Sequence, residues 1–160
     1  MKRIISAFIF LMMLAATATA QAPVEVAQNQ QALLESDDPQ LAANKKLVFD
    51  FWREVFQARN MDLAPQYMAE DYIQHNPNVP SGRQAFVNFF GQFEQRPVKD
   101  TIDDLVTIIA ERDIVILAFK REYPDPQNEG ETYTTTWFDM LRIEDGKLAE
   151  HWDYGTKSEN

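Results

Sequence analysis

The order of two hydrophobic patterns along the chain constrains its fold more than any other feature. Between residues 39 and 93, apolar side chains recur at helical spacing, as at Val48, Phe51 and Trp52. After Pro97 the pattern changes to short alternating segments that are rich in β-branched residues. Helices followed by strands are typical of an α+β domain, so the sequence predicts helices packed on one sheet.

Capping signals mark the first two helices. Asp38 and Pro39 form an N-cap and first-turn pair that begins a long amphipathic helix ending near Asn60. Asp62 can cap a short second helix that runs to Met68. Both helices therefore precede every predicted strand of the sheet.

A third helix and four strands complete the predicted domain. A capping box of Ser81 and Gln84 begins the third helix. Consecutive strands joined by short turns favour a strongly curved antiparallel sheet, with the three helices on its concave face. Such a cone-like roll can enclose a pocket. The strands are predicted at residues 101–110, 114–123, 131–143 and 147–154, after an extended stretch at 72–75.

The last hairpin can turn in two ways. A two-residue Asp-Gly loop would pair Met140 with His151, whereas a three-residue loop with Gly146 in the left-handed bulge position would pair Asp139 with His151. We favour the second register, whose other pairs are Ile143 with Lys147 and Trp137 with Asp153. One face then carries Trp137, Asp139, Leu141, Ala149, His151 and Asp153, and the other carries Phe138, Met140, Arg142, Leu148, Glu150 and Trp152.

The N-terminal segment has the layout of a secretory signal peptide. Lys2 and Arg3 precede an apolar run at residues 4–16, and small residues follow at 17–22. The apolar run is shorter than the roughly 20 residues that a membrane anchor needs. We expect cleavage after Ala20 and a periplasmic or secreted protein.

The mature chain is acidic and has no cysteine. Removal of the segment 1–20 leaves 13 basic against 25 acidic side chains, a net charge of −12. This charge disfavours nucleic acid and anionic membrane surfaces, and it leaves small molecules or proteins as partners. Residues 21–37 have the composition of a flexible leader, so the domain is expected to span 38–160.

Three segments together resemble the SnoaL-like polyketide cyclase family of the nuclear transport factor 2-like superfamily. They are residues 72–77, residues 137–142 and residues 144–153, and the resemblance extends over about 44–156. It implies a cone of curved sheet over three helices, often dimeric. The superfamily includes cyclases, isomerases, dehydratases, hydrolases and binding proteins, so the fold alone leaves the function open.

The family's cyclases close a ring by aldol condensation with acid and base side chains, without metal or organic cofactor. The resemblance maps its strand aspartate onto Asp139 and its polar histidine onto His75. Independently, Asp139 between Trp137 and Leu141 is a candidate base whose charge an apolar pocket would disfavour. A facing His151 would oppose that shift, and His75 could donate to a carbonyl or enolate oxygen.

Further side chains are candidates for ligand binding, and structural roles compete with each assignment. Tyr72, Gln74, Trp137 and Asp153 are the predicted ligand-binding residues. The Asp-His pair could be a cross-strand bridge, and Asp153 could accept hydrogen bonds from the backbone or an indole. His75 could hold its own turn, and the tryptophans could belong to the core.

The sequence has no diagnostic metal or cofactor motif. His75, His151 and Asp139 could form a three-ligand site, but their spacing matches no recurrent pattern, and we predict none. Glycine-rich phosphate loops and a serine nucleophile elbow are absent. We therefore expect a cofactor-free acid/base enzyme for a small carbonyl compound, an aldol-type cyclase, lyase or isomerase. The alternative is a binding or dimeric interaction module.

Two solution properties follow. The exported chain should begin at Gln21 and form a homodimer through the outer face of the sheet, which carries Phe138, Met140 and Trp152. Mass spectrometry of the exported chain and size-exclusion chromatography at micromolar concentrations measure both. A full-length product, or elution as a monomer across that range, would contradict the respective expectation.

Overall fold

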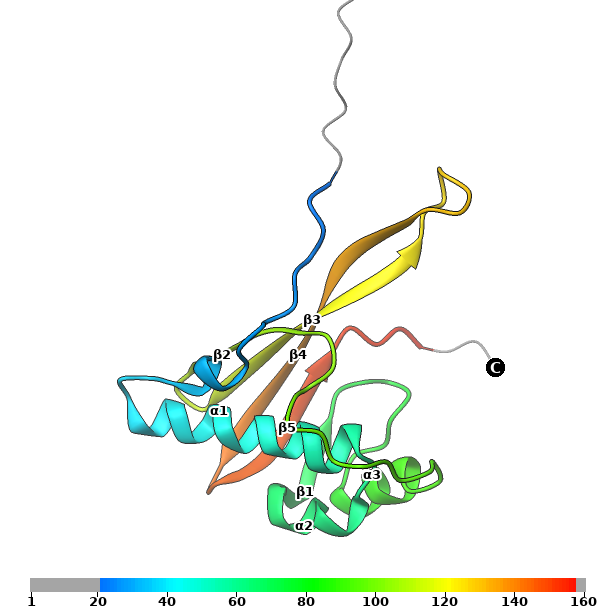
Figure 1. The fold of residues 1–160 in the computed structure, drawn as a ribbon. Coiled ribbons are helices and arrows are strands. Elements are labelled where there is room, and N and C mark those ends of the chain that lie inside the picture. The colour runs from blue at the N-terminus through cyan, green and yellow to red at the C-terminus, as the bar shows by residue number, and fades with distance from the viewer. Residues whose placement is uncertain (1–20, 158–160) are drawn as a thin grey trace, which may run out of the picture.

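The computed structural model describes residues 21–157 (Figure 1). The predicted signal peptide at 1–20 lies outside this range. Within it, no helix combines the length and apolar character that a bilayer crossing requires. The helices are α1 (Pro39–Phe51), α2 (Ala64–Tyr67) and α3 (Arg83–Phe90), and the strands are β1 (Met68–Gln74), β2 (Leu105–Glu111), β3 (Ile114–Pro124), β4 (Thr132–Glu144) and β5 (Lys147–Asp153).

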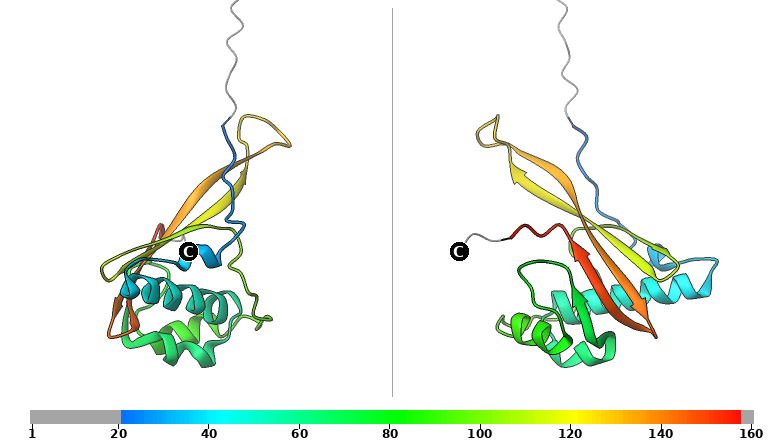
Figure 2. Two further views of the ribbon diagram at one scale, coloured as in Figure 1. Left: turned by 60° about the vertical axis from the view of Figure 1, so that its left-hand side comes forward. Right: turned by 180° about the vertical axis from the view of Figure 1, so that it is seen from behind.

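The strands form one curved, open sheet with helices on one face, which confirms the α+β prediction (Figures 1 and 2). The strand order is β1-β5-β4-β3-β2, and the four C-terminal strands make the expected antiparallel meander. β1, which includes most of the predicted extended stretch 72–75, adds a fifth strand parallel to β5. The sheet is therefore mixed, with one parallel pair, β1 and β5, and three antiparallel pairs.

The helix α1 begins as predicted and ends in wider turns. The Asp38 side chain accepts hydrogen bonds from two backbone amides of the first turn, at 2.8 and 3.4 Å. The helix continues into π-helical turns at Trp52–Gln57, where Ala58 N donates to Arg53 O at 3.1 Å. Such insertions occur often at functional sites because they re-aim side chains. Here the wide turns carry aromatic rings of the cavity described below.

Two predicted caps are wrong. The N-cap of α3 is Gly82, with a φ of 95° and no side-chain hydrogen bond, in place of the Ser81–Gln84 capping box. The Ser81 hydroxyl instead accepts from the backbone amide of Gln74 at 3.0 Å and so holds the end of β1. Asp62 lies inside the short 3-10 turn before α2 and caps neither helix.

The β4–β5 hairpin differs from both predicted registers. Glu144 pairs with Lys147, so Asp145 and Gly146 form a two-residue loop with φ values of 49° and 70°. A β-bulge then leaves Ala149 as an extra residue of β5. Beyond it, Asp139 faces Asp153 and Leu141 faces His151, so the predicted pairs of Asp139 with His151, Trp137 with Asp153 and Ile143 with Lys147 are wrong.

The bulge nevertheless preserves the predicted face of the polar side chains. An extra residue moves the register by one, and this restores the alternation that the shorter loop would have inverted. Asp139 and His151 are both buried on the inner face, with 4% and 8% of their surface exposed. Leu148 is an exception, since it pairs with Ile143 and lies in the core, not on the outer face.

The core lies between α1, α3 and the inner face of the sheet. It is built from aliphatic and aromatic side chains of these elements, and some of its members, such as Phe51 and Leu141, also line the cavity. Its fully buried large members are Phe49, Met68, Tyr72, Ile102, Leu105, Leu117, Phe119, Leu141 and Leu148. The outer ends of β3 and β4 extend beyond the helices as a two-stranded arm (Figure 2).

The segment 21–37, for which composition predicts a flexible leader, is instead packed on the domain. Ala27 N donates to Leu105 O at 2.8 Å. The buried Gln30 carboxamide bonds both the backbone N and the backbone O of Ile102, each at 2.8 Å. A polar side chain that satisfies two buried backbone groups ties this segment to the loop just before β2.

Replacement of Gln30 tests this attachment. Gln30→Ala leaves the two Ile102 backbone groups without their partner and should lower the free energy of unfolding by about 1–3 kcal/mol. Urea denaturation measures the difference, and Gln31→Ala, an exposed neighbour, is the matched control. Equal stability of both variants would contradict the attachment.

Candidate functional site

A cavity of about 220 Å³ lies between the helices and the inner face of the sheet. Seven of its fourteen described lining residues are aromatic, and five polar residues from β1, the turn after β1, β4 and β5 form one side. The aromatic residues are Phe51, Trp52, Phe56, Tyr72, Phe86, Phe89 and Phe90. The polar residues are Gln74, Asn76, Asp139, His151 and Asp153. Such a wall, apolar with a few convergent polar groups, is typical of small-molecule sites.

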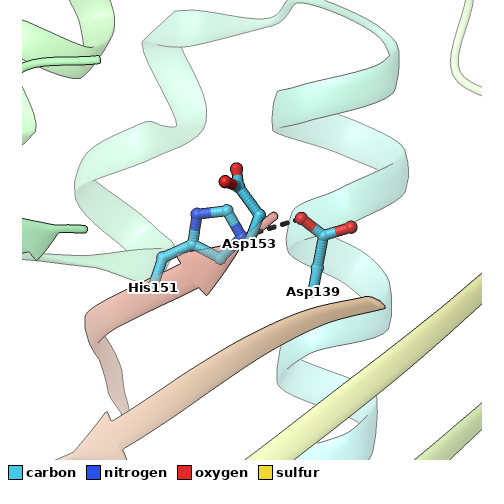
Figure 3. Close-up of side chains that lie close together, drawn as sticks. All are labelled: Asp139, His151 and Asp153. Carbon is cyan, nitrogen blue, oxygen red and sulfur yellow. Dashed lines mark hydrogen bonds and ion pairs between the residues drawn. The ribbon is translucent and has the colours of Figure 1, made fainter. Parts of the chain in front are cut away.

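Asp139 and His151 form a buried hydrogen-bonded pair at the centre of the polar side. His151 Nε2 lies 3.0 Å from Asp139 Oδ1 (Figure 3). The two residues are diagonal neighbours on adjacent strands, and the β-bulge gives them the same face. The second oxygen of Asp139 points away from His151 and has no hydrogen-bond partner among residues 21–157.

Gln74 determines the tautomer of His151. Asn76 N donates to Gln74 Oε1 at 3.0 Å, so the Gln74 amide nitrogen is directed at His151 Nδ1, 2.9 Å away. Because Nδ1 then accepts, the proton of neutral His151 sits on Nε2 and is donated to Asp139. A proton added at Nδ1 would find Gln74 Oε1 at 3.2 Å. Gln74 can therefore support either charge state of the ring.

Asp153 is the second carboxylate of the site. Both of its oxygens accept from Asn76 Nδ2, at 2.8 and 2.9 Å. Asn76 therefore orients Asp153 and, through its backbone, Gln74. The donor is a neutral amide, so the charge of Asp153 is hydrogen-bonded but not neutralised.

Tyr72 supplies a hydroxyl that stays protonated. Burial raises the pKa of Tyr72 above its usual value, and the negative charges of Asp153 and Asp139 raise it further. Gln74 Nε2 donates to the Tyr72 oxygen at 3.3 Å. The hydroxyl proton is therefore left for an acceptor in the cavity.

His75 lies outside the cavity, contrary to its predicted role. Because side chains alternate along β1, Gln74 points inward and His75 outward. The His75 ring stacks on Trp152 at 4.7 Å and bonds Glu150 at 3.0 Å. Hydrogen bonds from His75 and Arg142 lower the pKa of Glu150. His75, Glu150 and Trp152 therefore lie together on the outer face of the sheet.

The cavity wall includes three of the four predicted ligand-binding residues. Tyr72, Gln74 and Asp153 line the cavity, whereas Trp137 packs against the core and against Tyr154, with ring centroids 5.7 Å apart. Asn76 was missed by the sequence analysis. The alternation of side chains along an extended segment could have indicated Asn76, because residues 72, 74 and 76 share one face.

One set of side chains among residues 21–157 could hold a metal ion. Ligand atoms of Asp139, His151 and Asp153 lie within 4.8 Å of one another. Asp153 thus takes the place that the sequence gave to His75. The nitrogen of His151 that faces Asp139 already donates a hydrogen bond, which a metal would have to displace.

The sequence and the fold identify the family. The model of the SnoaL-like domain family matches residues 48–151, and the chain belongs to this family. A putative SnoaL-like polyketide cyclase from Jannaschia is similar in structure, with a TM-score of 0.52, 14% identity, and coverage of 75% of this chain and 90% of that chain. An epoxide hydrolase from M. tuberculosis of the LEH-like kind has a TM-score of 0.52, 14% identity, and coverage of 75% and 83%. No curated protein sequence matches significantly.

The raised pKa of Tyr72 predicts a pH dependence of stability. Above about pH 10, the unfolded tyrosine loses its proton while folded Tyr72 keeps it, so stability falls as pH rises. Tyr72→Phe should remove up to about 1.4 kcal/mol of this loss per pH unit. Urea denaturation between pH 8 and about pH 11 measures the slope.

Tyr123→Phe is the matched control, because that ring is exposed on the β3–β4 arm. The control should follow the wild-type slope. Equal slopes for the wild type and Tyr72→Phe would contradict the electrostatic description of the cavity.

Proposed function

We propose that the protein is a cofactor-free acid/base enzyme that removes a proton from the carbon beside the carbonyl group of a small compound. The observation that carries this proposal is the buried Asp139–His151 pair in a cavity with otherwise mostly aromatic walls. Membership in the SnoaL-like family supports it, because the family fold is compatible with such chemistry.

Asp139 is the base in this proposal. Its oxygen without a hydrogen-bond partner accepts the proton, and the electrons of the C–H bond move into the carbonyl to give an enolate. His151 keeps the other oxygen in place through Nε2. His151 thus orients the carboxylate and limits its rotation, as the third group of a catalytic set does.

Tyr72 stabilises the enolate oxygen. Its hydroxyl is held protonated by burial and by the two aspartates, and its oxygen already accepts from Gln74. A donor fixed before the reaction stabilises developing negative charge without reorganisation. Gln74 contacts both Tyr72 and His151, so it links the enolate-stabilising hydroxyl to the residue that orients Asp139.

The cavity selects for size. Its volume of about 220 Å³ is below the range of about 300–1,000 Å³ that is usual for drug-sized ligands. A compact compound fits this volume better than a large polycyclic one. The enolate then attacks a second carbonyl, as in an aldol-type cyclisation, or is reprotonated elsewhere, as in an isomerisation.

The proposed setting is extracytoplasmic and dimeric. The basic, apolar and small-residue layout of residues 1–22 supports export. Phe138, with 55% of its surface exposed, lies on the outer face of β4 and supports contact with a second copy. The helices cover the opposite face, so a dimer of this kind leaves the cavity intact (Figure 1).

Proton exchange tests the base directly. In deuterium oxide, wild-type protein should accelerate loss of the NMR signals of the protons beside the carbonyl of phenylacetone. Asp139→Asn should reduce this acceleration by about 100-fold or more, because the amide cannot accept the proton. Asp62→Asn removes the same charge at an exposed site and is the matched control. Equal rates for wild type and Asp139→Asn would contradict the proposal.

A further inference from the structure

We infer that the cavity selects an organic cation, a compact carbonyl compound that carries a protonated amine. The observation is an imbalance of charge. Two of the cavity-lining residues are aspartates, and none of those described is lysine or arginine. The part of the inference that concerns the carbonyl group rests on the proposed function, whereas the charge preference rests on the cavity alone.

Neither carboxylate is neutralised by a basic side chain. Asp139 is hydrogen-bonded to the imidazole of His151, and Asp153 accepts from the amide of Asn76. The described lining residues thus include two acidic side chains and no lysine or arginine, so their formal charge is negative. In a site shielded from water this charge attracts a cation far more strongly than it would in solution.

The burial of Asp139 adds a second argument for a ligand. Its side chain is 94% buried, with 6% of its surface exposed, and one of its oxygens has no hydrogen-bond partner in residues 21–157. Within residues 21–157, the unpaired side-chain atoms that are fully buried belong to Arg53 and Arg59, so this Asp139 oxygen is open to the cavity, where a ligand can reach it. This oxygen is left for the C–H proton of the proposed reaction, so an ammonium group on the same compound would pair with Asp153.

The walls favour an organic cation over a metal ion. Trp52 and several phenylalanine rings enclose the cavity, and aromatic faces attract ammonium groups through their negative quadrupole. A metal ion prefers oxygen, nitrogen or sulfur ligands and gains little from such walls. The aromatic walls and the carboxylates together fit a molecule with an apolar body and a charged amine.

A protonated amine also suits the proposed reaction. Positive charge beside a carbonyl group makes the neighbouring C–H bond more acidic, because it stabilises the enolate that forms. Asp153 would hold the ammonium group, which leaves Asp139 to accept the proton. Two carboxylates with separate tasks would explain why the cavity needs both.

Three one-ring probes that differ mainly in charge test the inference on the whole mature chain. Benzylamine is cationic at pH 7, benzyl alcohol is neutral and benzoate is anionic. Quenching of tryptophan fluorescence reports binding, because Trp52 lines the cavity. We expect the dissociation constant of benzylamine to be at least about tenfold lower than that of benzyl alcohol, and benzoate to bind most weakly.

Variants assign the effect to the cavity. Asp153→Asn should weaken benzylamine binding by about tenfold and change benzyl alcohol binding little. Asp62→Asn makes the same change of net charge at an exposed site that does not line the cavity, and it should bind benzylamine as the wild type does. The ratio of benzylamine to benzyl alcohol affinity is compared within each variant, so a loss of thermal stability common to both variants does not change the comparison.

Four results would overturn the inference. They are benzoate binding as tightly as benzylamine, equal binding of benzylamine and benzyl alcohol, no response to benzylamine up to its solubility limit, and an unchanged benzylamine affinity in Asp153→Asn. Stabilisation by zinc that requires both aspartates, without benzylamine binding, would indicate a metal site instead. Proton exchange without cation preference would refute only this inference, and cation preference without exchange would refute only the proposed function.

Discussion

The ladder between β4 and β5 carries one extra residue, Ala149, and its position determines which side chains reach the cavity. Without it, the two-residue loop would direct Asp139 and His151 to opposite faces of the sheet. With it, both lie on the concave side and form the buried hydrogen bond on which the chemistry of the site depends. The core tolerates the bulge because Leu148 fills the space beside Ile143.

The edge strand β1 completes the site by pairing with β5. Tyr72 and Gln74 then project into the cavity, and Asn76 after the strand reaches Asp153. Hydrogen bonds link these side chains to His151 and to both carboxylates and so orient them. No lysine or arginine is among the described residues that line the cavity. Asn76 lies in the turn after β1, whereas the other members of this network lie on strands, and their mutual hydrogen bonds arrange the polar side of the cavity before a ligand binds.

The sequence analysis predicted much of the fold and part of the site, and its failures have physical causes. Helical periodicity and the Asp38 cap are local, so they were read correctly. The register of the hairpin was wrong because a bulge depends on packing across two strands, and no residue type encodes it uniquely. His75 was placed in the site, whereas its neighbour Gln74 is there, because only the pairing of β1 shows which face is inside.

The sequence by itself determined the class of the fold, its three helices and its four C-terminal strands, and the residue types available for acid/base chemistry. These follow from patterns within short stretches of chain, where periodicity and capping act locally. Only the tertiary structure decided that Asp139, His151, Asp153 and Tyr72 meet, that His75 does not, and that no basic side chain among the described residues joins them in the cavity wall. Those outcomes depend on strand pairing between distant segments, which burial of the whole core selects.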